Sequence, residues 1–321
     1  MTDPQPHSRP LSRPLSHSGA LLAAVVAALL GVQPRAAAAQ TPYDNINKAA
    51  EAAKVTITPL RGGVYLVEGS GGNMAAIGGP EGLLLVDDGI AVSKDKMHAA
   101  LRGVGKGPLR YAINTHWHWD HTDGNAWARQ DGAIVVAHAN TARHLEDTLR
   151  VEEWGHTFTP VAPAARVDVR IDAPTTIAFA GDQLILRPYA PSHTDGDLAA
   201  YFQGADILLT GDIWWNGLYP FIDYVAGGGI DGMIAAADAS IAMAGPRTIV
   251  IPGHGPVGGR ADLVAYRHML STIRDNVARL KAQGLSVDQV IAARPTAAFD
   301  ETWGKAIISP ALFTRLVYRG V

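Results

Sequence analysis

The chain has 321 residues, of which 47% are hydrophobic and 18% are charged, and its formal net charge at pH 7 is −3. This composition is typical of a globular protein with enough apolar residues for one large core. The acidic balance and the lack of a Lys/Arg cluster argue against a nucleic-acid partner, because phosphates are bound by arrays of basic side chains. The chain has no Cys, which excludes disulfides and thiolate metal ligands.

The first 39 residues have the pattern of a secretory signal peptide. Residues 1–19 are rich in Pro, Ser and Arg, residues 20–30 are an apolar run of eleven, and three Ala at 37–39 precede Gln40. Eleven apolar residues are too few to span a bilayer, which takes about twenty, so we expect no stable membrane insertion. An uncleaved N-terminus is the alternative. Without residues 1–39, which hold three Arg and one Asp, the net charge is −5.

We therefore expect a signal peptide at 1–39, one globular domain at 40–321, and a periplasmic or secreted protein. The domain begins with a loose leader or short helix at 40–54, and two pairs of apolar runs separated by Gly predict hairpins at 55–68 and 74–86. Further strands are predicted at 109–114, 133–137, 175–179, 183–188, 199–202, 207–210 and 248–251. Helices are predicted at 92–102, from 126, and at 140–151, 230–243, 261–283 and 287–293. An apolar end at 312–318 is expected to dock on the rest of the domain.

One segment between a predicted strand and a predicted helix is dense in side chains that bind metals: His116, His118, Asp120 and His121 lie within six residues. His116 and His118 are two positions apart, so both imidazoles face one side of an extended segment, as they would not on a helix. Imidazole nitrogen with a carboxylate oxygen is a ligand set for Zn2+ or a similar metal. So many ionisable groups would be costly to bury without a partner, so the segment predicts a metal site in a strand-end loop.

The order His-x-His-x-Asp-His at 116–121 resembles the signature of the metallo-β-lactamase superfamily. The resemblance implies a mixed α/β (α+β) fold, a four-layer αββα sandwich with one or two metal ions between the edges of its two sheets. It also implies three further ligands downstream. Their counterparts, His193, Asp212 and His254, each follow a predicted strand and lie near Gly or Pro. The resemblance covers most of residues 40–321.

The resemblance implies two Zn2+ ions per chain, held by two sets of ligands that share a bridging carboxylate. The first set is His116, His118 and His193, the second is Asp120, His121 and His254, and the bridge is Asp212. Two cations that share a carboxylate and a water lower the pKa of that water, so hydroxide is available near neutral pH. Asp120 is also the expected catalytic residue, because it can orient or receive the proton of the nucleophile. Asp87 and Asp88 are expected to be turn residues or residues that support the site without binding metal.

The expected function is an exported zinc-dependent hydrolase that uses this hydroxide on an ester, thioester, lactone or amide-type bond of a small molecule. Trp215 and Tyr219, in an aromatic segment after Asp212, are the candidate substrate-binding residues, and Tyr219 is a candidate hydrogen-bond donor to a developing oxyanion. Trp154 and Phe158 are further candidates. Core packing is the alternative for all four aromatic side chains.

Three alternatives to this function remain open. A dedicated metallo-β-lactamase is not favoured, because the lactamase subclass with His at the position of His121 lacks the bridging Asp. An oxidoreductase of the mononuclear-iron persulfide dioxygenase type shares the His-x-His-x-Asp-His order, and metal analysis would separate it. The third is a metal-binding protein without enzymatic activity. The sequence leaves the substrate, the metal bound in vivo and the oligomeric state open.

Overall fold

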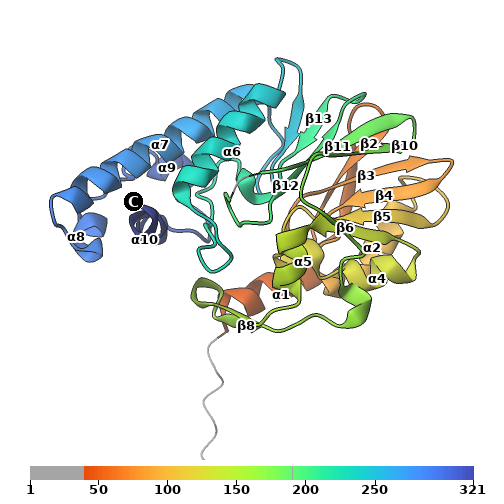
Figure 1. The fold of residues 1–321 in the computed structure, drawn as a ribbon, viewed down its shortest axis with the longest axis horizontal. Helices are drawn as coiled ribbons and strands as arrows, with labels where there is room; N and C mark the ends of the chain where they lie inside the picture. The colour runs from red at the N-terminus through yellow and green to blue at the C-terminus, as the bar shows by residue number, and fades with distance from the viewer. Residues whose placement is uncertain (1–39, 190) are drawn as a thin grey trace, which may run out of the picture. The chain divides into compact units, whose positions relative to one another are not determined.

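Two β-sheets form the centre of the domain in the computed structural model, which describes residues 40–189 and 191–321 (Figure 1). The predicted signal peptide at 1–39 lies outside the described residues. The first sheet has the strand order β1-β2-β3-β4-β5-β6-β9, and the second has the order β10-β11-β12-β13-β14. The strands of the first sheet are β1 Thr56–Pro59, β2 Val64–Glu68, β3 Met74–Gly79, β4 Gly82–Val86, β5 Leu109–Ile113, β6 Ile134–His138 and β9 Val169–Ile171. Those of the second are β10 Thr175–Phe179, β11 Asp182–Pro188, β12 Leu198–Phe202, β13 Ile207–Leu209 and β14 Ile249–Ile251.

Parallel pairing brings the ends of several strands to one edge. Strands β4, β5, β6 and β9 run parallel to one another, and β13 runs parallel to β14. The other pairs in the two sheets are antiparallel, and the hairpins predicted at 55–68 and 74–86 are confirmed as β1–β2 and β3–β4. Because parallel strands end at the same edge, loops that follow them can converge on one site.

Alternate residues of the central strands enter two different cores. In β4, Leu84 and Val86 belong to the core between the sheets, whereas Leu83 and Leu85 belong to the core beneath the helices. Successive side chains of a strand point to opposite faces of the sheet, so strands buried on both faces are continuously apolar. This double burial requires a layer of helices outside each sheet.

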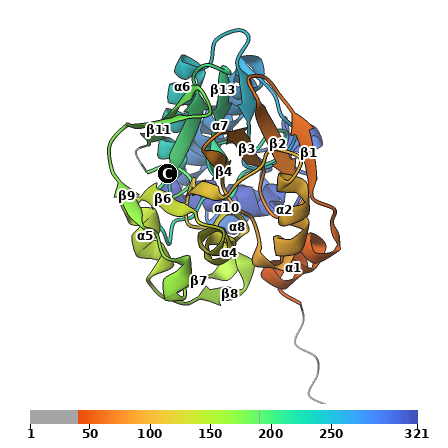
Figure 2. The same cartoon turned by 90° about the vertical axis from the view of Figure 1, so that its right-hand side faces the viewer.

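Helices supply the two outer layers. The helices α2 (Lys94–Leu101), α4 (Asn125–Gln130) and α5 (Ala139–Leu145) cover the first sheet, and α6 (Ile230–Met243) and α7 (Arg260–Ala282) cover the second (Figures 1 and 2). The predicted four-layer αββα sandwich is therefore confirmed. The remaining helices are α1 Pro42–Ala52, α3 Trp119–Thr122, α8 Val287–Ala292, α9 Asp300–Trp303 and α10 Pro310–Gly320. Among the described residues, none of the helices combines the length and the apolarity needed to cross a bilayer.

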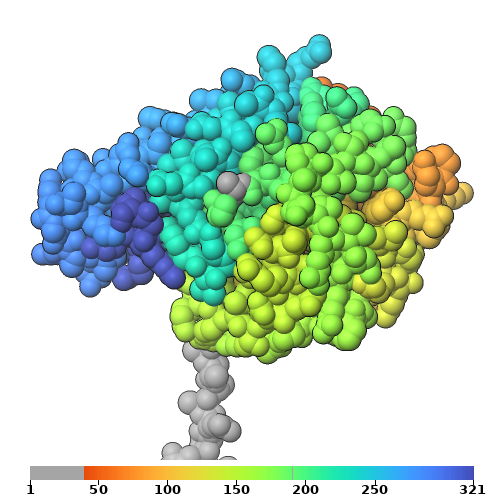
Figure 3. All heavy atoms as spheres, viewed as in Figure 1, coloured from red at the N-terminus to blue at the C-terminus, as the bar shows by residue number. Residues whose placement is uncertain are grey.

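Two terminal helices have clear start signals. Thr41 and Asp44 form a capping box at the start of α1, with Pro42 in the first turn. Ser309 caps α10, which also begins with Pro and packs against α6, α7 and α8. Figure 3 shows this C-terminal segment (blue) beside the region of α6 (cyan). The predicted docking of the apolar end is confirmed.

The helix predicted at 140–151 is wrong in its second half. Helix α5 ends at Leu145, and residues after it form a separate hairpin of β7 (Leu149–Val151) and β8 (His156–Phe158). Gly155 turns this hairpin with a φ of 64°, a left-handed conformation that glycine adopts without strain. The sequence did not reveal this change from helix to hairpin, because the charged residues 146–152 are compatible with an exposed helix face as well as with an exposed hairpin.

Candidate metal centre and adjoining cavity

Loops at the ends of strands carry all seven residues predicted as metal ligands. His116 and His118 follow β5, and the short helix α3 then carries Asp120 and His121. The other three follow strands of the second sheet: His193 after β11, Asp212 after β13 in the turn η4 (Gly211–Ile213), and His254 after β14. The centre therefore lies where loops of both sheets meet.

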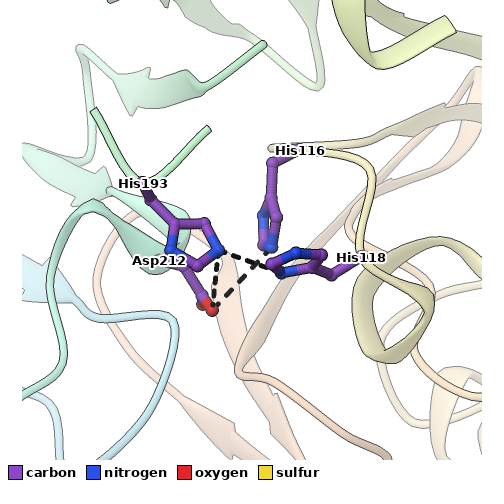
Figure 4. A group of neighbouring side chains, drawn as sticks. All are labelled: His116, His118, His193 and Asp212. Atoms are coloured by element: carbon purple, nitrogen blue, oxygen red, sulfur yellow. Dashed lines mark hydrogen bonds and ion pairs between the residues drawn. The ribbon is translucent and has the colours of Figure 1, made fainter. Parts of the chain in front are cut away.

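Four of these residues form a first group (Figure 4). One ligand atom from each of His116, His118, His193 and Asp212 lies within 4.8 Å of the others. Nδ1 of His118 is 2.9 Å from Nε2 of His193, and Oδ2 of Asp212 is 3.5 Å from the same nitrogen. All four side chains are buried.

Asp120, His121 and His254 form a second group within the same 4.8 Å limit. Oδ2 of Asp120 is 3.3 Å from Nε2 of His254. The other oxygen of Asp212, Oδ1, is 3.1 Å from Nε2 of His121 and 3.5 Å from Nε2 of His254. Asp212 thus directs one oxygen to each group, which is the geometry of a carboxylate between two metal positions.

Hydrogen bonds on the far side of the rings fix the orientation of the imidazoles. Nε2 of His118 donates to Asp223 at 2.9 Å, and Nδ1 of His193 donates to the carbonyl of Phe221 at 2.9 Å. Nδ1 of His121 donates to Asp87 at 2.8 Å. Each bond leaves the other ring nitrogen free to face the centre, as is usual for histidines that bind metals.

Asp87 supports the first loop of the centre. Its carboxylate accepts bonds from the backbone N–H and the hydroxyl of Thr115, at 2.7 and 2.8 Å, as well as the bond from His121. Since the Thr115 hydroxyl donates to Asp87, it accepts from Nδ1 of His116, 3.0 Å away. Asp87 has a φ of 60°, a strained conformation for a residue with a side chain. Its role as a turn residue that supports the site agrees with these contacts.

The donor set and its charges fit a divalent cation. Nε2 of His116, Nε2 of His121 and Oδ1 of Asp212 are buried without a hydrogen-bond partner among the described residues. Burial lowers the pKa of His116 and of His193, which keeps both in the neutral form that binds metals. Burial alone would lower the pKa of His254, but the carboxylates of Asp212 and Asp120 outweigh it and raise that pKa to about 9. The carboxylates of Asp120 and Asp212 therefore create a negative potential between the rings, which a bound cation would neutralise.

A cavity of about 340 Å3 adjoins the second group. His118, Asp120, Asp212 and His254 form its floor. Its walls are mainly apolar and include Ile46, Trp119, Trp154, Trp215, Leu218 and Ile307. The volume is within the range of small-molecule sites, which is about 300–1,000 Å3.

The predicted substrate residues fall in different places. Trp215 lines the cavity, with its ring centroid 4.4 Å from that of His254, and Trp154 lines it as well. Phe158 lines a separate cavity of about 220 Å3 together with Tyr43 and Trp117. The cavity beside the metal centre therefore includes Trp215 and Trp154 but not Phe158.

The prediction for Tyr219 needs correction. Its side chain is fully buried, stacks on Phe313 at 4.7 Å between centroids, and does not line the cavity. Its single hydroxyl proton is shared between the carbonyl of Thr296 and the carboxylate of Asp300, at 3.2 and 3.0 Å. The hydroxyl is thus hydrogen-bonded to the C-terminal segment and does not point into the cavity, where a reacting oxygen would lie.

Several residues of the site escaped sequence reasoning. Asp223 lies in irregular backbone with no spacing that relates it to His118. Ile46 and Ile307 come from near the two ends of the domain, and an isolated Ile gives no signal of a binding site. For Leu218 there was a signal, because the aromatic segment that contains it follows Asp212 directly.

Comparisons with known proteins agree with this geometry. The family model described as the metallo-beta-lactamase superfamily matches residues 67–259. A metallo-beta-lactamase from Pontibacter korlensis is similar in structure, with 20% identity and a TM-score of 0.55, covering 68% of this chain and 99% of that one. A B3 metallo-beta-lactamase with an active-site glutamic acid has 20% identity and a TM-score of 0.55, covering 75% and 96%. The inverting sec-alkylsulfatase Pisa1 from Pseudomonas sp. has 18% identity and a TM-score of 0.62; the match covers 83% of this chain and 50% of the sulfatase. At these identities the likeness concerns the fold.

Proposed function

The chain belongs to the metallo-beta-lactamase superfamily, and from this premise we propose that it is a zinc-dependent hydrolase acting on an ester, thioester, lactone or amide-type bond. The observation that carries the proposal is the position of Asp212, whose two oxygens lie toward two separate groups of imidazoles. Nitrogen and oxygen ligands without thiolate suit zinc. We propose two Zn2+ ions per chain, with the two groups as their ligands and Asp212 as the bridge.

Two bound zinc ions would supply Lewis acidity and would lower the pKa of a water molecule toward neutrality. The protein's own contribution is to orient its side chains and to handle the proton. Asp120 lines the cavity and has two oxygens, so one oxygen can bind metal while the other orients the attacking water and accepts its proton. His254 is the most exposed member of the centre, at 23% of its side chain, so substrate approaches from its side.

The apolar wall of the cavity favours hydrolysis of a small molecule over that of a polymer. Trp119, Trp154 and Trp215 surround the floor and limit the access of bulk water, which strengthens electrostatic interactions within the site. We also propose that residues 1–39 direct export, so that the mature enzyme works in the periplasm or outside the cell. The support for export is the sequence pattern of the N-terminus.

Hydrolysis of β-lactams is a second candidate. The observation in its favour is that this chain covers 99% and 96% of the length of two structurally similar β-lactamases. Against it stands the acidic side chain of Asp212 between the two imidazole groups. An iron-dependent oxidoreductase is the third, and it differs in the metal that it requires.

Metal content and turnover together test the proposal. We expect protein purified without chelator to carry close to two zinc ions per chain by elemental analysis, and to hydrolyse at least one member of a panel of esters, thioesters and lactones. Chelation should abolish hydrolysis, and added zinc should restore it. Asp212→Ala should lower turnover by orders of magnitude and bind less zinc, because one carboxylate serves both groups.

The matched control is Asp238→Ala, which removes an exposed carboxylate on α6 that pairs with Arg267. This variant should keep both metal content and activity. Full activity and two zinc ions in Asp212→Ala would contradict the bridging role. Iron in place of zinc would favour the oxidoreductase, and selective turnover of β-lactams would favour the second candidate.

A further inference from the structure

We infer that the cavity beside the metal centre is an apolar subsite that selects uncharged esters, thioesters or lactones carrying an aliphatic chain of several carbons. This inference rests on the proposed function, and it names the class of substrate for the same site. It depends on what the walls present to a ligand, on the charges within reach, and on the segments that build the rim.

The walls present carbon to the cavity. Three indole rings, those of Trp119, Trp154 and Trp215, form much of the lining. The Nε1 atoms of all three indoles are buried and inaccessible to solvent, so the ring atoms that face the cavity are carbon. Leu218 and Ile46 extend the apolar surface. Burial of each methylene against such a surface is worth about 0.8 kcal/mol, or about fourfold in affinity.

The charges within reach disfavour a ligand with a negative group far from the metals. Among the described residues that line the cavity there is no Lys or Arg, and the acidic ones are Asp120 and Asp212 of the metal centre. Lys305 is near in sequence to the rim, but it is exposed, pairs with Glu301, and does not line the cavity. A distal carboxylate or sulfate would therefore lose its hydration without gaining a cationic partner.

The rim comes from segments outside the region that the family model matches. Ile46 lies on α1, before residue 67, and Ile307 lies between α9 and α10, after residue 259. Ile307 is 46% exposed, so part of its side chain is available to a ligand at the mouth. These two residues and Leu218 join the indole walls into one apolar surface that runs from the metal centre to solvent.

A series of p-nitrophenyl esters tests the inference. For the zinc-loaded enzyme, kcat/KM should rise about fourfold per methylene from acetate to pentanoate. The glutarate monoester, which carries a carboxylate in place of the terminal methyl of a similar chain, should be poorer than pentanoate by at least about fiftyfold. A flat response to chain length, or equal rates for pentanoate and glutarate, would overturn the inference and leave the proposed hydrolase in place.

A charge placed on the rim should reverse this preference. Ile307→Lys supplies the missing cation at a position that is already 46% exposed, so it should lower kcat/KM for pentanoate and raise it for glutarate by about tenfold or more. The matched control is Val264→Lys, because Val264 is 44% exposed on α7 and lines no part of the cavity. If the ratio of kcat/KM for pentanoate to that for glutarate changed equally in both variants, the rim residue Ile307 would not determine the preference.

Equilibrium binding separates failure of the inference from failure of the proposed function. Neutral N-alkylacetamides of increasing chain length should perturb tryptophan fluorescence, with a dissociation constant that falls with each methylene in the native protein and less steeply in Ile307→Lys. If no ester is hydrolysed but this dependence is found, the apolar subsite stands and the proposed reaction fails. If neither chain length nor Ile307→Lys affects binding, the subsite fails whatever the reaction.

Discussion

Asp223 is the residue on which the orientation of His118 depends. One of its oxygens, Oδ2, accepts from Nε2 of His118 and from the indole of Trp117, at 2.9 and 3.1 Å. The other accepts from the backbone N–H groups of Val225 and Ala226. Burial would raise the pKa of Asp223, but these donors outweigh it and hold the pKa below its usual range. Asp223 is therefore a fixed carboxylate that positions a candidate metal ligand.

Replacing Asp223 by Asn should weaken metal binding while the fold survives. The amide keeps the shape of the carboxylate but is a weaker acceptor, so His118 loses its fixed orientation and some basicity. Loss of such a partner typically costs about 10- to 100-fold in metal affinity or activity. Competition with a coloured chelator measures the zinc affinity, and circular dichroism checks the fold.

The control for this change is Asp182→Asn. Asp182 is also a largely buried carboxylate that accepts backbone N–H bonds, from Gly204 and Ala205, but it lies at the start of β11, at the opposite end of the strand from His193. Asp182→Asn should lower stability and leave zinc affinity unchanged. If Asp223→Asn bound zinc as tightly as the native protein, Asp223 would have a structural role alone and would not be needed to position His118.

At the scale of single residues, the sequence picked out the candidate ligands that the structure brings together, because each one carries a local signal. His116, His118, Asp120 and His121 form a dense motif, and the later ligands follow apolar strands beside Gly or Pro. Asp223 carries no such signal, since its hydrogen bond to His118 spans 105 positions through irregular backbone. Contacts of that kind depend on how the two sheets dock.

The aromatic segment after η4 has two separate structural roles. Trp215 lines the cavity and contacts His254, whereas Tyr219, four residues later, packs into the C-terminal segment against Phe313. A helix or strand has a period that tells which side chains share a face. This segment is irregular and has no period, so its sequence could not divide the residues between substrate and core.

Tyr219→Phe should therefore destabilise the protein without changing catalysis. It removes the hydroxyl that donates to Thr296 and Asp300, and it keeps the stack on Phe313. Loss of this shared hydrogen bond, which involves a carboxylate, should cost about 1–3 kcal/mol of unfolding free energy. Denaturant unfolding measures this loss, and KM, kcat and zinc content should stay near the native values.

Trp215→Ala, in the same segment, should have the opposite effect to Tyr219→Phe. Since Trp215 forms part of the cavity wall, this change should raise KM for substrates with an aliphatic chain. A change of KM in Tyr219→Phe with no loss of stability would return Tyr219 to the substrate site and contradict the role in packing.

At the scale of the whole molecule, the candidate ligands join two halves of the fold. His116, His118, Asp120 and His121 come from loops of the first sheet, and His193, Asp212 and His254 come from loops of the second. A bound metal can form its full set of bonds only when the sheets are docked. Binding to the folded state alone stabilises that state by mass action.

Removal of the metal should lower thermal stability. At free zinc about a thousand times its dissociation constant, one bound ion contributes about 4 kcal/mol, which for a domain of about 280 residues corresponds to roughly 7 °C in Tm. Calorimetry before and after chelation measures the shift. Asp212→Ala, which loses a ligand shared by both groups, should show a smaller shift. An unchanged Tm after verified loss of zinc would mean that the two sheets dock without help from the metal.

The sandwich was predictable at this scale because the motif and the strands leading to each ligand agree on one architecture. The return of the C-terminal segment to the cavity was not. The segment 304–309 between α9 and α10 contributes Ile307 to the cavity, and α10, which follows it directly, packs on α6 and α7. That packing depends on the three-dimensional fit of apolar faces, which the order of residues alone does not specify.

The origin of the cavity rim has a consequence for how such an enzyme can diversify. The groups expected to perform the reaction lie within residues 116–254, whereas Ile46 and Ile307 lie near opposite ends of the domain, in segments that supply none of the candidate ligands. Mutations in these two segments can alter which molecules enter without disturbing the chemistry at the floor. A gene library confined to Ile46 and Ile307 would explore new specificities at little risk to the reactive centre.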